Sequence, residues 1–267
     1  MNSSFEHHIK KQLSRYRAQG LEDLEDASLM NRVDTKFVLP LAMVPELLGV
    51  LQKDFAALEI NGERIFRYEN IYYDTPHFLF YNMHHQGRLN RHKVRVRKYL
   101  DSNTRFLEVK FKNNKRRTIK NRVELPENYA EDLKEYLGFL SDTDVPKAKE
   151  LVPCQRSRYQ RIALVSPTRC ERLTIDIGLR HKMLSGNNSA KTYMDDIAIV
   201  ELKQKKVCRA SPFFVFMKKK GIRQSSISKY CVGLMMASMK NGMLKYNRFK
   251  GVARRVAKLG KSENPVS

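Results

Sequence analysis

The feature that most constrains this chain is a strict alternation of charged and apolar residues in short segments. Residues 93–97 read Lys-Val-Arg-Val-Arg, and residues 106–112 read Phe-Leu-Glu-Val-Lys-Phe-Lys. Successive side chains of a β-strand point to opposite faces, so a period of two predicts strands with one apolar face and one charged face. The chain is therefore expected to build a sheet that separates a hydrophobic side from a charged side.

Strands dominate the predicted secondary structure, with short helices between some of them, so the expected fold class is α+β. Helices are expected at 40–55, 127–140 and 226–240, and another is expected to open at Ser211-Pro212 and end at Gly221. The predicted strands are residues 32–38, 67–75, 93–97, 106–112, 118–125, 159–165, 172–179 and 197–203.

The charged faces of these strands consist almost entirely of Lys and Arg with a few acids. One interpretation is an ordinary sheet whose charged face is solvated. The other is a closed antiparallel sheet with the charged faces inside and helices on the apolar outside, which removes exposed strand edges. A lumen lined by like charges requires counter-charge, because buried unpaired ions are costly. We favour the second interpretation, with a chain of phosphates and a divalent metal as the occupant.

Net charge supports a polyanionic partner. The 267 residues include 51 Lys and Arg against 28 Asp and Glu, a net charge of +23. Such a charge fits nucleic acid, an anionic membrane surface or a phosphate compound. Residues 88–122 carry fourteen basic residues against two acids, and residues 245–261 carry seven against none. The second cluster is expected to be a solvated or frayed tail, with the surface of an anionic partner as the alternative.

Cysteine usage and the N-terminus favour a reduced, cytoplasmic protein. The four cysteines form no C-x-x-C pair, residues 1–17 lack an apolar signal core, and no apolar run reaches membrane-spanning length. We expect a helical or linker segment at 1–29, one tunnel domain at 30–240 and a basic tail at 241–267.

Nine short motifs, in order along most of the chain, resemble the VTC domain, the polyphosphate polymerase module of the triphosphate tunnel metalloenzymes (a CYTH-like superfamily). They are Arg32-Val33-Asp34-Thr35-Lys36-Phe37, Tyr72-Tyr73-Asp74-Thr75, Lys93-x-Arg95-x-Arg97-x-Tyr99, Glu108-x-Lys110, Lys120-x-Arg122, Tyr159-x-Arg161, Arg172-Leu173-Thr174-Ile175-Asp176, Glu201-Leu202-Lys203 and Ser228-Lys229-Tyr230.

The resemblance implies an eight-stranded antiparallel β-tunnel with flanking helices. It also implies transfer of the γ-phosphoryl group of ATP to a growing inorganic polyphosphate chain, with Mn²⁺ or Mg²⁺. The wider superfamily opens its first strand with Glu-x-Glu-x-Lys, whereas this chain has Arg32-x-Asp34-x-Lys36. That departure favours the polyphosphate branch over thiamine triphosphatases and class IV adenylyl cyclases, and leaves fewer acids for a metal.

On this resemblance, cationic side chains would bind phosphate oxygens, Arg through a planar fork and Lys as a point charge. Glu201 would hold the metal through a hard carboxylate oxygen, or else pair with a cation. Asp176 and Glu108 are open between metal support and ion pairing, and Ser228 between ligand contact and helix cap. The residues expected to act in catalysis are Lys36, Arg95, Arg97, Lys110, Arg161, Arg172, Lys203 and Lys229. Further phosphate-binding residues are Lys93, Lys120, Arg122 and Ser228.

Two other functions stay open at this point. The same scaffold could hydrolyse tripolyphosphate or nucleoside triphosphate, or bind polyphosphate without turnover. Nucleic acid is disfavoured, because Phe106 and Phe111 lie on opposite strand faces and so form no stacking platform. No Walker A motif, G-x-G-x-x-G or H-E-x-x-H is present. His84, His85 and His92 are expected to be surface or structural residues, with a catalytic role as the alternative. The expected partners are ATP and polyphosphate, and the resemblance allows a membrane-protein partner.

Overall fold

The computed structural model describes residues 3–21, 33–115, 117–184, 190–239 and 244–261. Arg32, expected to open the first long strand, lies outside these ranges. The helices are α1 (Ser3–Leu13), α3 (Val44–Leu51), α4 (Leu79–His85), α5 (Leu137–Asp142), α6 (Pro212–Lys219), α7 (Lys229–Ser238) and α8 (Lys250–Lys261). The strands are β1 (Arg17–Gln19), β2 (Val33–Pro40), β3 (Ala56–Leu58), β4 (Ile65–Asp74), β5 (Arg91–Tyr99), β6 (Arg105–Lys112), β7 (Thr118–Leu125), β8 (Val152–Ser166), β9 (Glu171–Met183), β10 (Lys191–Met194) and β11 (Ile197–Gln204). Short 3₁₀ turns are η1 (Leu41–Met43), η2 (Lys134–Tyr136), η3 (Ala148–Glu150) and η5 (Asn247–Phe249).

All eight predicted strands are present, and they form one continuous antiparallel path. Its order is β2-β11-β9-β8-β4-β5-β6-β7. The short strands β1, β3 and β10 extend this sheet at its margins. Three or four residues are too few for alternation to stand out, which is why the sequence pattern missed them.

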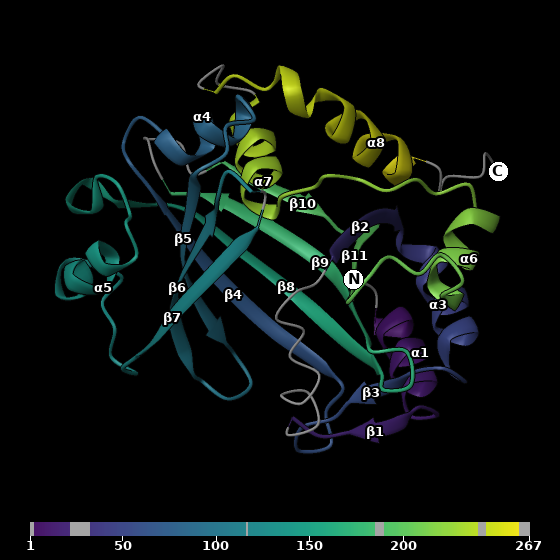
Figure 1. Cartoon of the computed structure of the whole chain (residues 1–267). Coiled ribbons are helices and arrows are strands. Elements are labelled where there is room, and N and C mark those ends of the chain that lie inside the picture. Colours follow the sequence, from purple (N-terminus) through teal and green to yellow (C-terminus); the bar gives the residue numbers. More distant parts are fainter. Residues whose placement is uncertain (1–2, 22–32, 116, 185–189, 240–243, 262–267) are drawn as a thin grey trace.

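The sheet curls so that strands distant in its order face each other across a concave side (Figure 1). Lys110 on β6 and Glu201 on β11 interact electrostatically, although four strands lie between them in the path. Lys93 on β5 and Lys36 on β2 interact in the same way. β2 and β7 end the path, and within the described ranges no backbone pairing joins them. The expected tunnel is therefore a strongly curled sheet whose closure does not come from a hydrogen-bond ladder between its outer strands.

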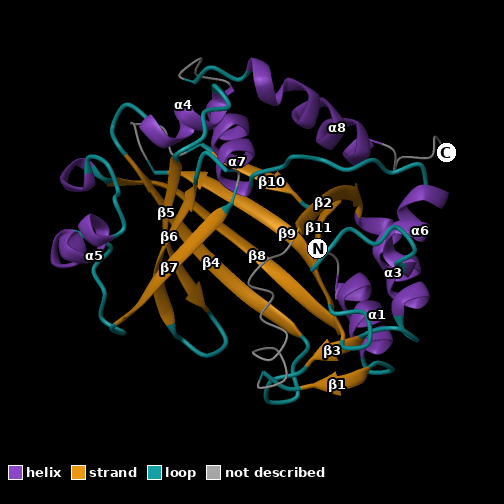
Figure 2. Cartoon of the chain, in the orientation of Figure 1, coloured by secondary structure: helices purple, strands orange, loops and turns teal. Residues whose placement is uncertain are grey.

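Helices cover the apolar outer face in two groups (Figure 2). Helices α1, α3 and α6 pack on outward residues of β2, β11, β9 and β8, such as Phe37, Leu173 and Val200. Helix α5 and the turns beside it pack on Val94, Val96 and other outward residues of β4–β7. Helix α7 instead packs against inward-facing residues at one end of the concave side. Burial of the apolar row thus turns the charged row toward the interior of the curl.

Three predicted helices differ in extent. Residues 127–133 are not helical, since Glu131 has a left-handed backbone (φ 63°) that no α-helix allows, and only η2 and α5 follow. The segment 40–55 splits into η1 and α3. Helix α7 starts at Lys229 because Ser228 caps it, accepting a hydrogen bond from the Cys231 backbone N–H. Helix α6 runs as expected, followed by Gly221 with φ 65°.

The C-terminal tail is expected to be solvated or frayed: in its described part Lys250, Arg254 and Lys258 are exposed, but the segment is not frayed. Residues 250–261 form helix α8, and Phe249 and Val256 are buried in the core shared with α7. The apolar side chains spaced along α8 explain the docking, because they form one stripe of the helix. None of the described helices has both the length and the apolar character needed to cross a bilayer.

Candidate phosphate-binding site

The concave face is organised around a buried carboxylate on β6. Glu108 lies opposite Arg95 of β5 and Arg122 of β7 in the strand register. Arg95 Nε and Nη2 donate to Glu108 Oε2 at 2.8 and 2.5 Å, and Lys120 Nζ lies 2.6 Å from Oε1. Burial alone would raise the pKa of Glu108, but Arg95, Arg97 and Lys120 outweigh it and hold the pKa well below its usual range. Glu108 is therefore an ion-pair partner that orders two cations.

A second buried carboxylate does the same on β9. Arg161 Nε and Nη2 donate to Asp176 at 2.6 and 2.9 Å, and Lys229 at the start of α7 is its other partner. Burial favours the neutral acid, but Arg161 and Lys229 prevail and the pKa of Asp176 is lowered. Of the two roles expected for Asp176, the geometry favours ion pairing.

Tyrosine rings fix the planes of two guanidinium groups. Tyr68 and Tyr159 stack with centroids 5.4 Å apart and planes 6° from parallel. The guanidinium carbons of Arg97 and Arg161 lie 5.3 and 5.2 Å from the Tyr68 centroid, within cation–π range. Arg97 also donates to Asn70 Oδ1 at 3.1 Å and to the Tyr159 hydroxyl at 3.3 Å. Neither Arg97 contact is to a carboxylate, so its charge remains available to an anion.

Two lysines of the concave face have ammonium groups without a direct partner among the described residues. The ammonium groups of Lys36 and Lys110 make no ion pair or hydrogen bond with any described residue. Burial and the nearby charge of Arg95 lower the pKa of Lys110 well below its ordinary value. Both side chains reach the concave face from opposite walls, Lys36 from β2 and Lys110 from β6. The Glu201 carboxylate acts electrostatically on both lysines, and a bound anion would offset the positive charge that remains.

Glu201 on β11 is the third carboxylate of the concave face, after Glu108 and Asp176. It lies opposite Lys36 of β2 and Thr174 of β9 in the register, and Lys203 Nζ is 3.4 Å from its Oε1. Burial would raise its pKa, but Lys203, Lys36, Lys110 and Lys229 together lower it well below its usual value. The Thr174 hydroxyl is buried and has no hydrogen-bond partner among the described residues.

This donor set fits a divalent metal shared with a bound phosphate. Among the described residues there is no cluster of three or more His, Cys, Asp or Glu that could enclose an ion without help. Mg²⁺ is usually held by one or two carboxylates together with substrate phosphates and waters. Glu201, with the unpaired Thr174 oxygen beside it, supplies the hard oxygen ligands that such an arrangement needs.

A family comparison agrees with this arrangement. The family model described as "VTC domain" matches residues 31–238. The chain belongs to the VTC domain family. The match begins just before β2 and ends at the last residue of α7, so it includes every strand and helix that contributes a side chain to the site.

Solved structures show weaker similarity to this VTC domain. A putative adenylate cyclase from Bacillus halodurans shares 14% identity, with a TM-score of 0.49, over 74% of this chain and 96% of its own. A putative adenylyl cyclase from Hippeastrum, described as having a dominant triphosphatase activity, shares 15% identity, with a TM-score of 0.46, over 80% of this chain and 97% of its own. A comparison with curated protein sequences finds no match.

The VTC domain brings together most of the residues expected to bind phosphate. Arg172 lies opposite Lys203 in the register and joins the same wall. Lys93 donates to the Ser228 hydroxyl at 3.1 Å, and Ser228 caps α7. Of the two roles expected for Ser228, the structure shows the helix cap, and a ligand contact stays a prediction. Arg122 stands apart: it is exposed on the outer strand β7, with its guanidinium over the Phe106 ring.

The three histidines pack against aromatic rings. Burial, reinforced by nearby cations, lowers the pKa of His84 to about 2, so its ring is neutral. His92 is buried and stacks on Phe111 with centroids 4.6 Å apart. His85 packs edge-on against Phe249.

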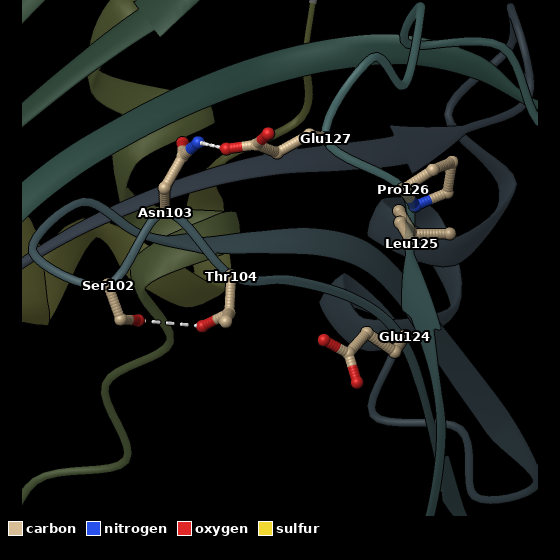
Figure 3. A pocket seen from close by; sticks show the side chains of 7 residues that line it. All are labelled: Ser102, Asn103, Thr104, Glu124, Leu125, Pro126 and Glu127. Carbon is tan, nitrogen blue, oxygen red and sulfur yellow. Dashed lines mark hydrogen bonds between the residues drawn. The ribbon is translucent and has the colours of Figure 1, made fainter.

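A surface pocket of about 470 Å³ is lined by none of the cationic residues of the candidate site (Figure 3). It is bounded by the β5–β6 turn and the end of β7, where Glu124 and Glu127 contribute negative charge and no Lys or Arg takes part. Asn103 donates to Glu127 across it. An acidic lining repels phosphate, so this pocket is not the candidate site of the VTC domain.

Residues without an assigned role in the sequence analysis turn out to position α7. Asp74 accepts hydrogen bonds from the backbone N–H groups of Thr75, Phe80 and Tyr81 at 2.8–2.9 Å and from the Tyr230 hydroxyl at 2.5 Å. The Tyr-Tyr-Asp-Thr and Ser-Lys-Tyr motifs therefore meet at one carboxylate. That contact fixes the start of α7, whose first residue reaches Asp176.

A glycine lets α7 approach the concave face closely. A Cβ at Gly233 would lie 2.4 Å from His181 Nδ1 and 2.5 Å from Gln155 Nε2. Real side chains essentially never approach so closely, so any larger residue would displace the helix. The Asp74 anchor and this close approach together hold Ser228 and Lys229 over the site.

Replacing Asp74 with Ala is expected to lower the free energy of unfolding by about 2–4 kcal/mol, because it leaves buried N–H and O–H donors without an acceptor. Denaturant unfolding measures the change. Asp132→Ala, which removes an exposed carboxylate, is the control and should change stability by less than about 0.5 kcal/mol. An Asp74 variant as stable as the control would show that the anchor is not structural.

Phosphate binding should weaken at alkaline pH. Burial, together with the cations around each group, lowers the pKa of Lys93 and of Lys203 to about 8. Each ammonium is then lost as the pH rises from 7 to 9, and one neutralised lysine should reduce tripolyphosphate affinity about tenfold at pH 9. Calorimetric titration at pH 7, 8 and 9 measures this.

Lys93→Arg is the matched control, since its guanidinium stays charged over this range. The variant should lose less affinity between pH 7 and 9 than the original protein. Identical pH profiles would mean that Lys93 does not contact the anion.

Proposed function

We propose that this VTC domain transfers the γ-phosphoryl group of ATP to the end of a growing inorganic polyphosphate chain. Membership of the family and the cationic site indicate an enzyme of phosphate transfer or hydrolysis. The observation that supports polyphosphate synthesis in particular is that cations outnumber carboxylates on the concave face. Lys36, Lys110 and Arg97 make no ion pair within 4 Å with any carboxylate of the described residues, although Glu201 acts electrostatically on both lysines.

The chemistry asks more for positioning than for a protein nucleophile. A terminal oxygen of the acceptor chain attacks the γ-phosphorus, the bond from that phosphorus to the β-bridging oxygen breaks, and ADP leaves with the bond electrons. The acceptor oxygen is already anionic at neutral pH, so no general base is required. Arg95, Arg97 and Arg161 would hold successive phosphates through guanidinium forks.

Charge spread over the transferred group needs neutralisation at that moment. Lys36, Lys110, Lys203 and Lys229 surround Glu201 and would contact the equatorial oxygens. Mn²⁺ or Mg²⁺, bound by Glu201 and the phosphates, would supply Lewis-acid polarisation of the phosphoryl oxygens. The fixed ion pairs of Glu108 and Asp176 keep the cations in place before substrate binds, which lowers the reorganisation cost of the reaction.

Incubation of the purified protein with ATP and Mn²⁺ or Mg²⁺, followed by gel separation of products, tests the proposal. Long polyphosphate together with ADP is expected. Orthophosphate without polymer would mean that water is the acceptor, as in a hydrolase of the same scaffold. Binding of polyphosphate with no product in either metal would indicate a binding module. The cytoplasmic location stays a prediction from cysteine usage, and association with a membrane protein stays untested.

A further inference from the structure

Two segments without any acidic residue pack together beside one end of the site. Residues 75–100 and residues 202–262 contain no Asp or Glu. They meet where the Phe249 ring packs against Tyr81, His84 and His85 with centroids 5.5–5.8 Å apart. The Tyr81 hydroxyl also donates to the Lys245 carbonyl at 2.9 Å. Cations on these segments therefore receive no neutralising carboxylate from either one.

The inner row of β5 leads out of the site toward this junction. Arg97, Arg95, Lys93 and Arg91 alternate along one face, and Arg91 is the first residue of the strand. Arg91 is half-buried, and its guanidinium donates to the Arg88 carbonyl at 2.5 Å. Burial and the charge of Arg248 lower the pKa of Arg91, which places Arg248 within electrostatic reach.

Arg248 connects that row to helix α8. Its backbone N–H donates to His85 Nε2 at 3.4 Å. Its guanidinium lies directly over the backbone of Gly87, where an added Cβ would be only 2.1 Å from Nη1. Helix α8 starts two residues later, so its first turn continues the sequence of cations outward from Arg91.

The outer face of α8 carries a regular cationic stripe. Lys250, Arg254 and Lys258 are exposed and four residues apart, so they lie one above the next. Like charges at this spacing destabilise an isolated helix, and an anion along the stripe would remove that repulsion. The opposite side of α8 contributes Val252, Val256 and Leu259 to the core.

This arrangement fits a soluble polyanion better than a lipid surface. A helix that lies on a membrane inserts its apolar face between lipids. The apolar face of α8 is already packed on the protein, and the large hydrophobic side chains exposed in the described ranges include none from α8. A flexible chain of phosphates needs only the charges.

We propose that Arg91, Arg248, Lys250, Arg254 and Lys258 form a cationic track that holds the part of a polyphosphate chain protruding from the site beyond Lys93. This inference rests on the proposed function, because it requires polyphosphate in the concave site. It adds a second binding surface, which short phosphate compounds cannot reach while they occupy that site.

The test compares long-chain polyphosphate with tripolyphosphate in calorimetric titrations. The variant replaces three stripe residues: Lys250→Gln, Arg254→Gln and Lys258→Gln. Gln is a good helix former, so α8 should be retained, which far-UV circular dichroism checks. Affinity for long-chain polyphosphate should fall about tenfold, the sum of three exposed charge contacts, whereas tripolyphosphate affinity should change less than about twofold.

The control variant removes the same charge from the exposed surface at and after α6, by Lys218→Gln, Lys219→Gln and Arg223→Gln. It should bind both ligands as the original protein does. An equal loss in stripe and control variants, or an unchanged long-chain affinity in the stripe variant, would overturn the track.

Two further outcomes distinguish the cationic track from a membrane-binding role of the stripe and from the proposed function. Loss of binding to phosphatidylserine vesicles, with long-chain affinity unchanged, would assign the stripe to a membrane and overturn the track. Failure of the original protein to bind tripolyphosphate would overturn the proposed function itself, and the track with it. Normal tripolyphosphate binding with an unaffected stripe variant would overturn the track alone.

Discussion

Glu201→Gln is expected to lower turnover of ATP at least about 100-fold while nucleotide binding persists. The substitution keeps the shape of the side chain and removes the carboxylate that the metal requires. Four lysines whose charges act on Glu201 remain, so the site becomes more positive. The affinity of the variant for ATP should therefore equal or exceed that of the original protein. Steady-state kinetics across a Mn²⁺ and Mg²⁺ titration, with calorimetry for ATP binding, separates the two effects.

Glu46→Gln provides the matched control, because Glu46 on α3 pairs with Lys220 at the surface. It should leave turnover unchanged. Near-normal activity of the Glu201 variant over the whole metal titration would reduce Glu201 to an ion-pair partner of Lys203.

Arg97→Ala is expected to lower kcat/KM about 30-fold or more. Arg97 is only 7% exposed and its hydrogen-bond partners among the described residues are neutral, so a bound phosphate would give it a direct anionic contact. Loss of a charge-assisted contact from a desolvated site costs about 2–5 kcal/mol, which corresponds to at least that reduction. Kinetics with ATP as the varied substrate measures it.

Lys218→Ala with Lys219→Ala removes two exposed cations from α6 and should cost less than about threefold, since solvent and salt screen them. A larger effect from this pair than from Arg97→Ala would place the functional charge on the outer surface. That result would show that the reaction does not take place on the concave face.

Local patterns were sufficient to predict the eight strands and the inward row of cations. The reason is visible at Arg95 and Glu108: each alternates with buried Val or Leu, so burial of the apolar neighbours decides which way the charges point. Neighbouring strands in a short hairpin then bring the two side chains opposite each other. A contact between residues 13 positions apart is therefore accessible from alternation alone.

Contacts between distant strands were not accessible in this way. Tyr68 and Tyr159 stack because β4 pairs with β8 in one register, and an irregularity in the pairing of β8 with β9 at Tyr159 changes the local alignment. No local pattern specifies that register. The contact of Asp74 with Tyr230 likewise depends on where α7 docks on the sheet.

The open margin between β2 and β7 has a consequence for how a long product is retained. In a fully closed barrel a polymer can leave only by sliding through, so retention is a matter of topology. Here the described outer strands are not joined by a backbone ladder. On the proposed function, guanidinium and ammonium contacts would hold the polyphosphate chain, and processivity would depend on ionic strength and on the protonation of the lysines.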